Sequence, residues 1–278
     1  MNPSLALSAA ALEARPRPLS AASASTLRGI RGVMTDIDDT LTRDGEIEPE
    51  ALAALHALDE AGLPVIAITG RPLGWSQPFA RAWPVAALVA ENGAVALVRE
   101  GAQVLTEFEQ DAPTRAQHAR RLQAVAQRIV REVPGAVLAR DSAGRVTDIA
   151  IDHSEFTHLP AQGIAAVVAL MREEGMTATV SSIHINGWYG KHSKWTGAQW
   201  MLRRCFGRAL QDELAHWAYV GDSTNDQVMF ERFPFSVGVA NLRRFADELM
   251  HWPAWITQAE RGQGFAELAR AMLAARAG

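Results

Sequence analysis

Little in this 278-residue chain suits the protein classes that depend on cysteine. Cys205 is the single cysteine, so the chain cannot form an internal disulfide, and zinc sites built from several cysteines are excluded. It lies in the stretch QWMLRRCFGRAL, where we expect a buried or half-buried apolar position on a helix. A reducing compartment fits this cysteine usage, and we expect a cytoplasmic protein.

Long apolar runs and excess basic charge are also missing. No apolar run approaches the roughly 20 residues that a membrane-spanning helix needs, so we expect no membrane partner. The formal net charge is −4, neither half of the chain is strongly basic, and the eight tryptophans are scattered. A nucleic-acid partner is therefore not expected. An anionic ligand would have to be attracted by local charge.

What the sequence does contain is enough apolar material for a sizeable core. Hydrophobic residues make up 48% and charged residues 21%, which is ordinary for a globular protein. Residues 1–28 are different, because they are rich in Ala, Ser and Arg and poor in acids. We predict a disordered extension there, with a transit peptide as the alternative.

Ordered structure is predicted to begin near Gly29 with alternating strands and helices. Continuous apolar or β-branched runs predict strands buried on both faces, and Pro49 to Gly62 has the spacing and end signals of a helix. The strands are expected within 31–38, 63–70 and 85–93. Strands that alternate with helices predict a parallel sheet with crossover helices.

The middle of the chain has another pattern. Helices are predicted at 113–133 and 160–175, an antiparallel hairpin at 135–152 and a further strand at 177–186. Alternating rather than solid apolar runs indicate a small α+β domain with one open face, which we place at residues 98–188. The strand and helix pattern of the first part then returns. The predicted fold is therefore α/β: a Rossmann-like parallel-sheet core, 29–97 and 189–278, with an inserted α+β cap domain.

Four short polar segments stand at or near the ends of predicted core strands. They are Asp36-Ile37-Asp38-Asp39-Thr40, Thr69-Gly70-Arg71, Lys194 at a helix start, and Gly221-Asp222-Ser223-Thr224-Asn225-Asp226. Ligands of open parallel sheets bind beyond the carboxyl ends of the strands, so these segments should converge on one site. An EF-hand calcium loop is excluded, because Leu41 stands where its glycine is needed and Ile47 where its glutamate is needed.

In order and spacing, these segments resemble the four motifs of the haloacid dehalogenase superfamily: DxDxT, a strand-end Thr, a Lys, and GDxxND. The insertion between the second and third motifs resembles the cap of the type IIB (Cof-type, sucrose-phosphatase-like) branch, as does ENGA at 91–94. The resemblance covers about residues 29–272. It implies a phosphomonoesterase that uses Mg²⁺ and forms an aspartyl-phosphate.

Roles for individual residues follow from this resemblance. Asp36 would be the nucleophile and Asp38 the general acid and base, while Thr69 and the Gly70 amide would contact the phosphoryl group and Lys194 would stabilise its charge. Oxygen ligands are typical of Mg²⁺. The predicted metal site comprises Asp36, Asp38 through its backbone carbonyl, Asp222, Asn225 and Asp226. Lys191 competes with Lys194 for the third motif, although Lys194 better fits a lysine placed directly before the helix.

Substrate contacts are expected from the cap. Candidates are Arg71, His184, Asn186 and Lys191, with a salt bridge as the alternative for Arg71 and a plain surface hairpin as the alternative for residues 181–191. By analogy with relatives that have similar caps, the substrate would be a sugar phosphate or a glycosylated phosphoglycerate. A phosphomutase of the phosphomannomutase type and a catalytically silent metabolite-binding protein are the rival interpretations. The sequence leaves the oligomeric state open.

Overall fold

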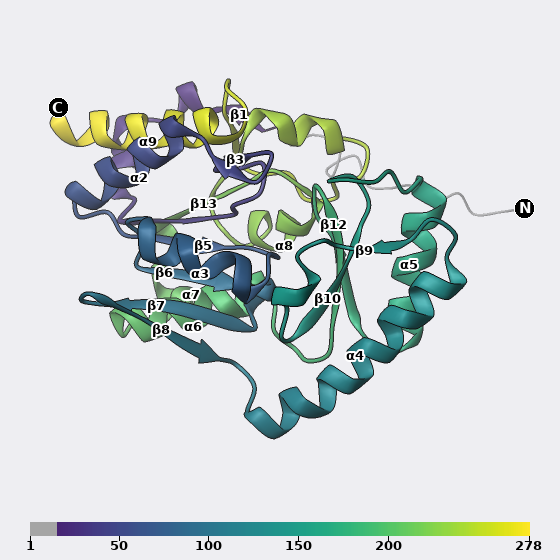
Figure 1. The fold of residues 1–278 in the computed structure, drawn as a ribbon. Helices are drawn as coiled ribbons and strands as arrows, with labels where there is room; N and C mark the ends of the chain where they lie inside the picture. The colour runs from purple at the N-terminus through teal and green to yellow at the C-terminus, as the bar shows by residue number, and fades with distance from the viewer. Residues whose placement is uncertain (1–15) are drawn as a thin grey trace, which may run out of the picture.

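The structure is a computed structural model that describes residues 16–278 and divides into a core and a cap (Figure 1). Within these residues, the core is built on a nine-stranded sheet with the order β1-β15-β14-β13-β2-β5-β6-β7-β8. The strands from β1 to β6 in this order run parallel, whereas β7 and β8 are antiparallel to their neighbours. The strands are β1 Arg17–Pro18, β2 Gly32–Thr35, β5 Val65–Ile68, β6 Ala87–Ala90, β7 Val95–Glu100, β8 Gln103–Phe108, β13 Trp217–Gly221, β14 Phe235–Gly238 and β15 Trp255–Ile256.

Helices cover both faces of this sheet because its central strands are apolar on both faces. In β2, for example, Val33 belongs to one hydrophobic cluster and Met34 to another, as expected for neighbours that point to opposite faces. The Val33 face is covered by α1 Ala24–Gly29, α2 Pro49–Glu60, α3 Leu73–Ala82 and α9 Arg261–Ala277, and the Met34 face by α6 Lys194–Phe206, α7 Leu210–Glu213 and α8 Gln227–Phe230. Figure 1 shows α2 and α9 side by side above the sheet. The predicted α/β core is confirmed.

The cap is a four-stranded antiparallel sheet backed by two helices. Its strand order is β11-β12-β10-β9, with β9 Val137–Leu138, β10 Asp148–Asp152, β11 Thr177–Val180 and β12 His184–Trp188. Helices α4 Ala112–Glu132 and α5 Ala161–Glu173 pack on one face of this sheet through a separate hydrophobic cluster. The predicted hairpin is confirmed, because β9 and β10 pair antiparallel.

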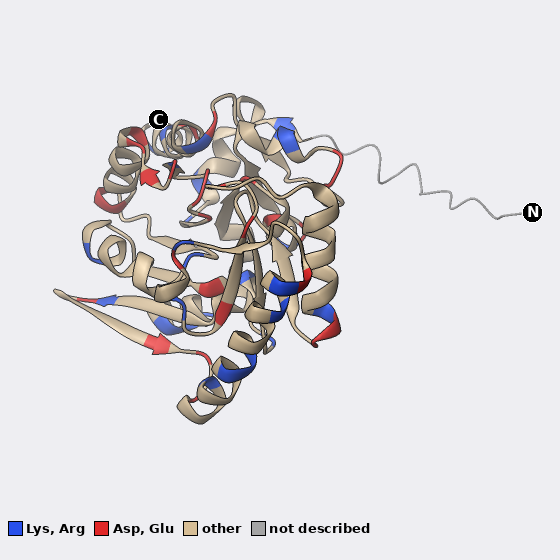
Figure 2. Cartoon of the chain, turned by 45° about the vertical axis from the view of Figure 1, so that its right-hand side comes forward, with Lys and Arg blue, Asp and Glu red and all other residues tan. Residues whose placement is uncertain are grey.

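Short elements complete the chain. A two-stranded hairpin follows the first acidic segment, formed by β3 Thr42–Arg43 and β4 Glu46–Ile47. The 3-10 turns are η2 Leu19–Ala21, η3 Glu91–Gly93, η4 Ser142–Gly144, η5 Leu214–His216, η6 Thr224–Asp226 and η7 Ala240–Phe245. Among residues 16–278, no helix is long and apolar enough to cross a membrane. Charged residues of both signs are spread over the core and the cap (Figure 2).

Two predicted boundaries need correction. The core sheet does not end at residue 97, because β7 and β8 pair with β6 as an antiparallel extension that continues to Phe108. The predicted disordered extension, 1–28, is wrong for residues 16–28: β1 pairs with β15, and Leu19 and Leu27 are buried in the core. These few apolar residues are sufficient because they pack against α9 and β15. Residues 1–15 lie outside the described part.

Candidate active site

The first acidic segment begins where β2 leaves the sheet. The Asp36 backbone N–H still donates to the Val220 carbonyl in β13, at 2.9 Å, so its position is fixed by the sheet ladder. Its carboxylate is 4% exposed and accepts a long hydrogen bond, 3.4 Å, from the Thr40 hydroxyl. Asp39 has a positive φ of 55°, which turns the chain away after Asp38. The sheet and this turn together fix the Asp36 carboxylate beyond the carboxyl end of β2.

Lys194 is the lysine that reaches this carboxylate. It is the first residue of α6, behind a capping box formed by Ser193 and Thr196. Its Nζ lies 2.6 Å from Asp36 Oδ1 and 2.7 Å from Asp226 Oδ1, and the side chain is almost fully buried. These two carboxylates outweigh the effect of burial and raise the pKa of Lys194, so the ammonium is charged.

Asp226 is held by its own loop, which follows β13. Its Oδ2 accepts hydrogen bonds from the backbone N–H groups of Asp222 and Ser223, at 3.0 and 3.2 Å, and its Oδ1 accepts one from the Tyr219 hydroxyl. Gly221 leaves the required space, because a Cβ there would lie 2.5 Å from the Asp226 carboxylate. The GDSTND segment therefore folds around Asp226.

Asp36, Asp222 and Asp226 form a cluster that fits a hard cation. One carboxylate oxygen of each lies within 4.8 Å of the others, and all three side chains are buried. Asp222 Oδ1 has no hydrogen-bond partner among the described residues, although its Oδ2 accepts from Asn241, at 3.2 Å, and Arg244, at 3.0 Å. An unpaired buried carboxylate oxygen is costly unless a cation binds it. This donor set, all oxygen, is the type that Mg²⁺ prefers.

The electrostatics of the cluster point in the same direction. Burial raises the pKa of Asp36 to about 8, because Asp226 and Asp38 add to the effect of desolvation and Lys194 only partly offsets it. Burial and the neighbouring Asp36 and Asp226 likewise raise the pKa of Asp222 well above its usual range. Lys194 and Arg244 offset burial and the mutual repulsion of the carboxylates only in part, so a divalent cation would help to keep all three ionised at neutral pH.

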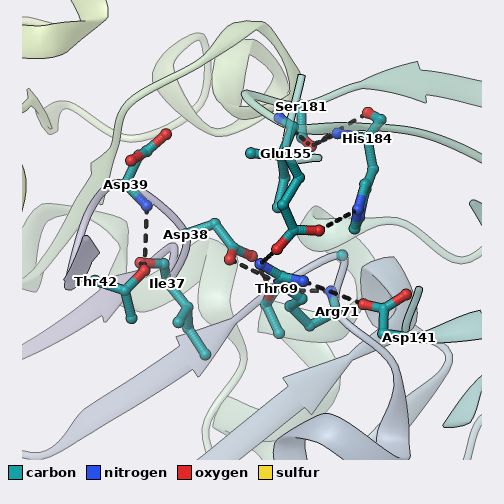
Figure 3. Close-up of polar contacts among 12 residues, drawn as sticks. Ile37, Asp38, Asp39, Thr42, Thr69, Arg71, Asp141, Glu155, Ser181 and His184 are labelled. Atoms are coloured by element: carbon teal, nitrogen blue, oxygen red, sulfur yellow. Dashed lines mark hydrogen bonds and ion pairs between the residues drawn. The ribbon is translucent and has the colours of Figure 1, made fainter. Parts of the chain in front are cut away.

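Asp38 binds a different set of side chains (Figure 3). Its Oδ2 accepts a hydrogen bond of 3.3 Å from the Thr69 hydroxyl, and its Oδ1 lies 2.8 Å from Arg71 Nε. The Thr69 hydroxyl in turn accepts the Arg71 backbone N–H at 3.0 Å. The second predicted segment therefore binds the Asp38 side chain. The Asn225 amide oxygen accepts a hydrogen bond from Lys194, at 3.3 Å, and its place in the metal site stays a prediction.

Two acidic residues of the cap also bind Arg71. Its guanidinium lies 2.7 Å from Glu155 and 3.3 Å from Asp141, so one cation bridges the core and cap carboxylates (Figure 3). His184 Nε2 lies 2.8 Å from the other oxygen of Glu155. Burial alone would raise the pKa of Glu155, but His184 and Arg71 outweigh it and hold that pKa down to about 2. The salt-bridge alternative for Arg71 is therefore observed.

Gly70 contacts the cap through its carbonyl. This oxygen accepts from Asn186 Nδ2 at 3.3 Å and from Arg145 at 2.9 Å. Arg145 and Asn186 also bind Asp148, whose pKa burial raises to about 7 despite the Arg145 cation. Thus both core residues that follow Thr69 bind cap side chains.

Glu91 is a further buried link between the two parts. Its side chain comes from the core turn after β6, where Glu91 and Asn92 both have positive φ. One oxygen accepts the backbone N–H groups of Leu73 and Val146, at 3.0 and 3.1 Å. The other accepts the backbone N–H and hydroxyl of Thr147, at 2.6 and 2.5 Å. The ENGA segment thus ties the cap to the core.

The cavity between core and cap is nearly closed. Its lining comes from the core at the carboxyl ends of the parallel strands and from the cap loop before β12: Asp36, Asp38, Gly70, Arg71, Ser181, Ser182, Ile183, His184, Asn186, Ser223 and Asn225. The free volume is about 10 Å³, room for about one water molecule. Substrate entry therefore requires the cap to move. Lys191 is exposed and is not part of this lining.

Sequence reasoning missed several residues of this site. Asp141, Arg145 and Glu155 are cap residues that carry no motif, and only the closed arrangement brings them to the core segments. Arg244 also carries no motif, but it comes from the core turn η7, which places it 3.0 Å from Asp222. Glu155 lies in a cap loop close to His153, whose Nε2 is 3.0 Å from the Ser181 carbonyl. Glu91 belongs to the ENGA segment, which the sequence analysis identified as part of the resemblance. Its partners Leu73, Val146 and Thr147 belong to no motif.

Comparisons with known proteins agree with this geometry. Residues 33–122 match the family model described as haloacid dehalogenase-like hydrolase. The phosphoglycolate phosphatase of Methanothermobacter thermautotrophicus is 28% identical over 87% of this chain and 98% of its own length. Phosphoglycolate phosphatase 1 of Saccharolobus solfataricus is 24% identical over 88% of this chain and 96% of its own length.

Solved structures share the fold. The Thermoplasma acidophilum 0175 protein superposes with a TM-score of 0.67 at 14% identity, covering 88% of this chain and 98% of that one. The sucrose-phosphatase of Synechocystis, solved with sucrose and phosphate, gives a TM-score of 0.61 at 15% identity, covering 87% and 98%. At such identities the likeness concerns the fold, including the inserted cap.

Proposed function

Because the chain is a haloacid dehalogenase-like phosphatase with a type IIB cap, we propose that it hydrolyses small phosphate monoesters through a phosphorylated Asp36, with Mg²⁺ as cofactor. The observation that carries this proposal is the buried contact of Asp36 with Lys194 beside Asp222 and Asp226. A carboxylate held next to a fixed cation and two further carboxylates is suited to accept a phosphoryl group once a metal ion is bound.

In the proposed first step, an oxygen of Asp36 attacks phosphorus while the bond to the leaving oxygen breaks. Asp38, two residues further along an extended segment, gives its proton to that oxygen. In the second step water attacks the aspartyl-phosphate, Asp38 takes the proton of the water, and inorganic phosphate leaves. Lys194 stabilises the negative charge of Asp36 and the transferring group throughout. Mg²⁺, bound by Asp36, Asp222 and Asp226, would neutralise the charge between nucleophile and phosphate.

Arg71 and Thr69 hold the Asp38 carboxylate in place. Both donate to its carboxylate, at 2.8 and 3.3 Å, and so fix its orientation in the closed form. When the cap opens, Arg71 loses the cap carboxylates Glu155 and Asp141, and its charge becomes available to a substrate. We propose that cap closure and the position of Asp38 are linked through Arg71.

For the substrate, we propose a small phosphorylated carboxylic acid such as phosphoglycolate. One observation supports it: the two relatives named above are phosphoglycolate phosphatases. The Arg71 guanidinium, which binds three carboxylates in this structure, is suited to bind a substrate carboxylate. A sugar phosphate remains the second candidate, because His184 and Asn186 line the cavity and the sucrose-phosphatase shares the fold.

The test is phosphate release from phosphoglycolate, a panel of sugar phosphates and p-nitrophenyl phosphate, with Mg²⁺ and with a chelator. We expect Mg²⁺-dependent release with phosphoglycolate as the best substrate, and none from Asp36→Asn. Release by Asp36→Asn at the wild-type rate would contradict the aspartyl-phosphate. With hexose phosphates, product analysis separates the mutase interpretation, since a mutase returns the phosphoryl group to the sugar.

A further inference from the structure

Another cavity lies at the opposite end of the core sheet, about 510 Å³ in volume. Its lining residues precede or begin three parallel strands: Arg28 and Arg31 stand before β2, Gly62-Leu63-Pro64 before β5, and Trp217 is the first residue of β13. Phe206 and Arg208 at the end of α6 and Arg276 in α9 complete it. The amino ends of parallel strands share one edge of a sheet. This arginine cavity is therefore remote from Asp36, which follows the carboxyl end of β2.

Four arginines line the arginine cavity with little opposing charge. Arg208 has one carboxylate partner, Glu213, at 3.6 Å. Within residues 16–278, no carboxylate oxygen lies within 4.0 Å of Arg28, Arg31 or Arg276. The chain as a whole carries a net charge of −4, so this local excess of positive charge runs against its overall balance.

Arg276 and Arg28 are held by backbone carbonyls. Arg276 donates to the carbonyls of Leu27, at 3.1 Å, and Met272, at 2.8 Å, and Arg28 Nε donates to Ala275 at 2.9 Å. The pKa of Arg276 is lowered by burial, and no acid compensates it. These bonds fix the end of α1 against α9. They leave the two terminal nitrogens of Arg28 and the whole guanidinium of Arg31 without a hydrogen bond among the described residues.

The rest of the lining supplies apolar surface and one more donor. Leu63, Pro64 and Phe206 flank Trp217, which is 3% exposed and packs 5.8 Å from Phe206 between ring centroids. Trp217 Nε1 is buried and has no acceptor among the described residues. The indole rests on Gly32, where a Cβ would lie 2.5 Å from the ring. The arginine cavity therefore combines hydrogen-bond donors with apolar walls. Among the described residues, no acceptor pairs with the Trp217 N–H or the free guanidinium nitrogens of Arg28 and Arg31.

We propose that the arginine cavity binds a phosphate-bearing organic anion of nucleotide size. Guanidinium groups bind phosphate oxygens through paired hydrogen bonds, and a lone indole N–H suits a further oxygen acceptor. A volume of about 510 Å³ falls in the range of small-molecule sites, and inorganic phosphate would leave most of it empty. The apolar residues would contact the organic part of the ligand. The site would act separately from the catalytic one.

Calorimetric titration of the full chain with ADP, pyrophosphate and inorganic phosphate, in a chelator and at fixed salt, tests the proposal. The chelator keeps metal-dependent binding at the carboxylate cluster out of the measurement. We expect one ADP per chain, bound more tightly than either inorganic anion. Arg28→Gln combined with Arg31→Gln should weaken ADP binding by about tenfold or more, because charged hydrogen bonds are lost.

Two further variants make the test specific. Trp217→Phe keeps a ring and removes the N–H, so it should weaken ADP binding about three- to tenfold. Arg172→Gln, an exposed arginine of the cap, should leave it unchanged. Thermal melts verify that each variant is folded, and phosphatase activity should be unaffected by the Arg28 and Arg31 changes. No ADP binding at millimolar concentration, equal binding by the double variant, or binding of inorganic anions alone would overturn the proposal.

Discussion

The core and the cap contribute to the catalytic cavity in different ways. Core groups stand at strand ends and are fixed by their own domain: Asp36 by the ladder to β13, and Asp226 by two backbone N–H groups of its loop. Cap groups reach the site as side chains from loops and a sheet face, and Glu155 and Asp141 bind the core residue Arg71 in addition to their cap partners His184 and Arg145. The contacts that hold Asp36 and Asp226 therefore lie within the core. The contacts of the cap acids with Arg71 exist only in the closed form.

Because of this difference, we expect the core and the cap to have separate roles in the reaction. Core residues should determine the chemical step and the metal requirement, and cap contacts should determine which substrate is accepted and how closure depends on conditions. Changes in the core should therefore lower kcat for every substrate, and changes at the cap contacts should act on particular substrates.

The largest effect is expected from Lys194→Met, with Lys191→Met as the matched control. Lys194 is the buried cation between Asp36 and Asp226, so its loss should lower kcat roughly 10³-fold for every substrate, whereas Lys191→Met should change it less than about twofold. Lys194→Met should also melt at lower temperature without Mg²⁺ and recover partly with it. Equal activity of the two variants would show that Lys194 is not catalytic.

A smaller effect is expected from Asp222→Asn. The variant loses a carboxylate whose Oδ1 is buried without a partner, so the Mg²⁺ concentration for half-maximal rate should rise by about 10–100-fold or more. Asp212→Asn, at an exposed position of α7, serves as control. The readout is phosphate release across a Mg²⁺ series. An unchanged Mg²⁺ dependence would contradict the assigned metal site.

The variant Arg71→Gln tests the core residue that binds the cap. We expect kcat/KM to fall about 10–100-fold for phosphoglycolate, because a charged contact with the substrate is lost together with the support of Asp38. For p-nitrophenyl phosphate, which has no carboxylate, the fall should be under about tenfold and confined to kcat. The exposed Arg172→Gln is the control. An equal fall in kcat/KM with both substrates would show that Arg71 does not determine specificity and only positions Asp38.

The smallest effect concerns pH and Glu155. Its folded pKa, about 2, lies below the usual value for a glutamate, so ionised Glu155 stabilises the closed form above that usual value and this contribution is lost as the pH falls towards 2. Glu155→Gln should lower Tm by about 2–4 °C at neutral pH. The difference from wild type should shrink as the medium is acidified below about pH 4.3.

The exposed Glu50→Gln should melt like wild type at each pH. A Tm difference for Glu155→Gln that grew on acidification would have the opposite sign and would contradict the closed-form ion pair.

The same division explains what could be predicted from the sequence. Asp36, Thr69, Lys194 and Asp222 follow or begin regular elements, and the edge of a parallel sheet brings such positions together regardless of detail. The preference for Lys194 over Lys191 came from its place at a helix start, where the structure indeed buries it. Their chemical roles remain predictions.

The contacts between cap and core could not be predicted from the positions of strand and helix ends. Glu155 and Asp141 are ordinary acids in loops, and their proximity to Arg71 depends on how one domain closes on another. The error at residues 16–28 has a related cause: Leu19 and Leu27 are buried only because distant α9 and β15 receive them. The prediction of disorder for residues 16–28 rested on their own composition and took no account of these distant partners. In both cases the decisive partner is remote in sequence and belongs to no periodic pattern.

One hydrogen bond joins the two places where the chain crosses between core and cap. Gln110 Nε2, on the way into the cap, donates to the carbonyl of Tyr189, on the way out, at 3.0 Å. Next to it, Gly190 has a φ of +122°, and a Cβ there would lie 2.3 Å from that same amide. The cap thus begins and ends at one point of the core. A segment inserted between neighbouring points leaves the host sheet intact, which is the geometry that an inserted domain requires.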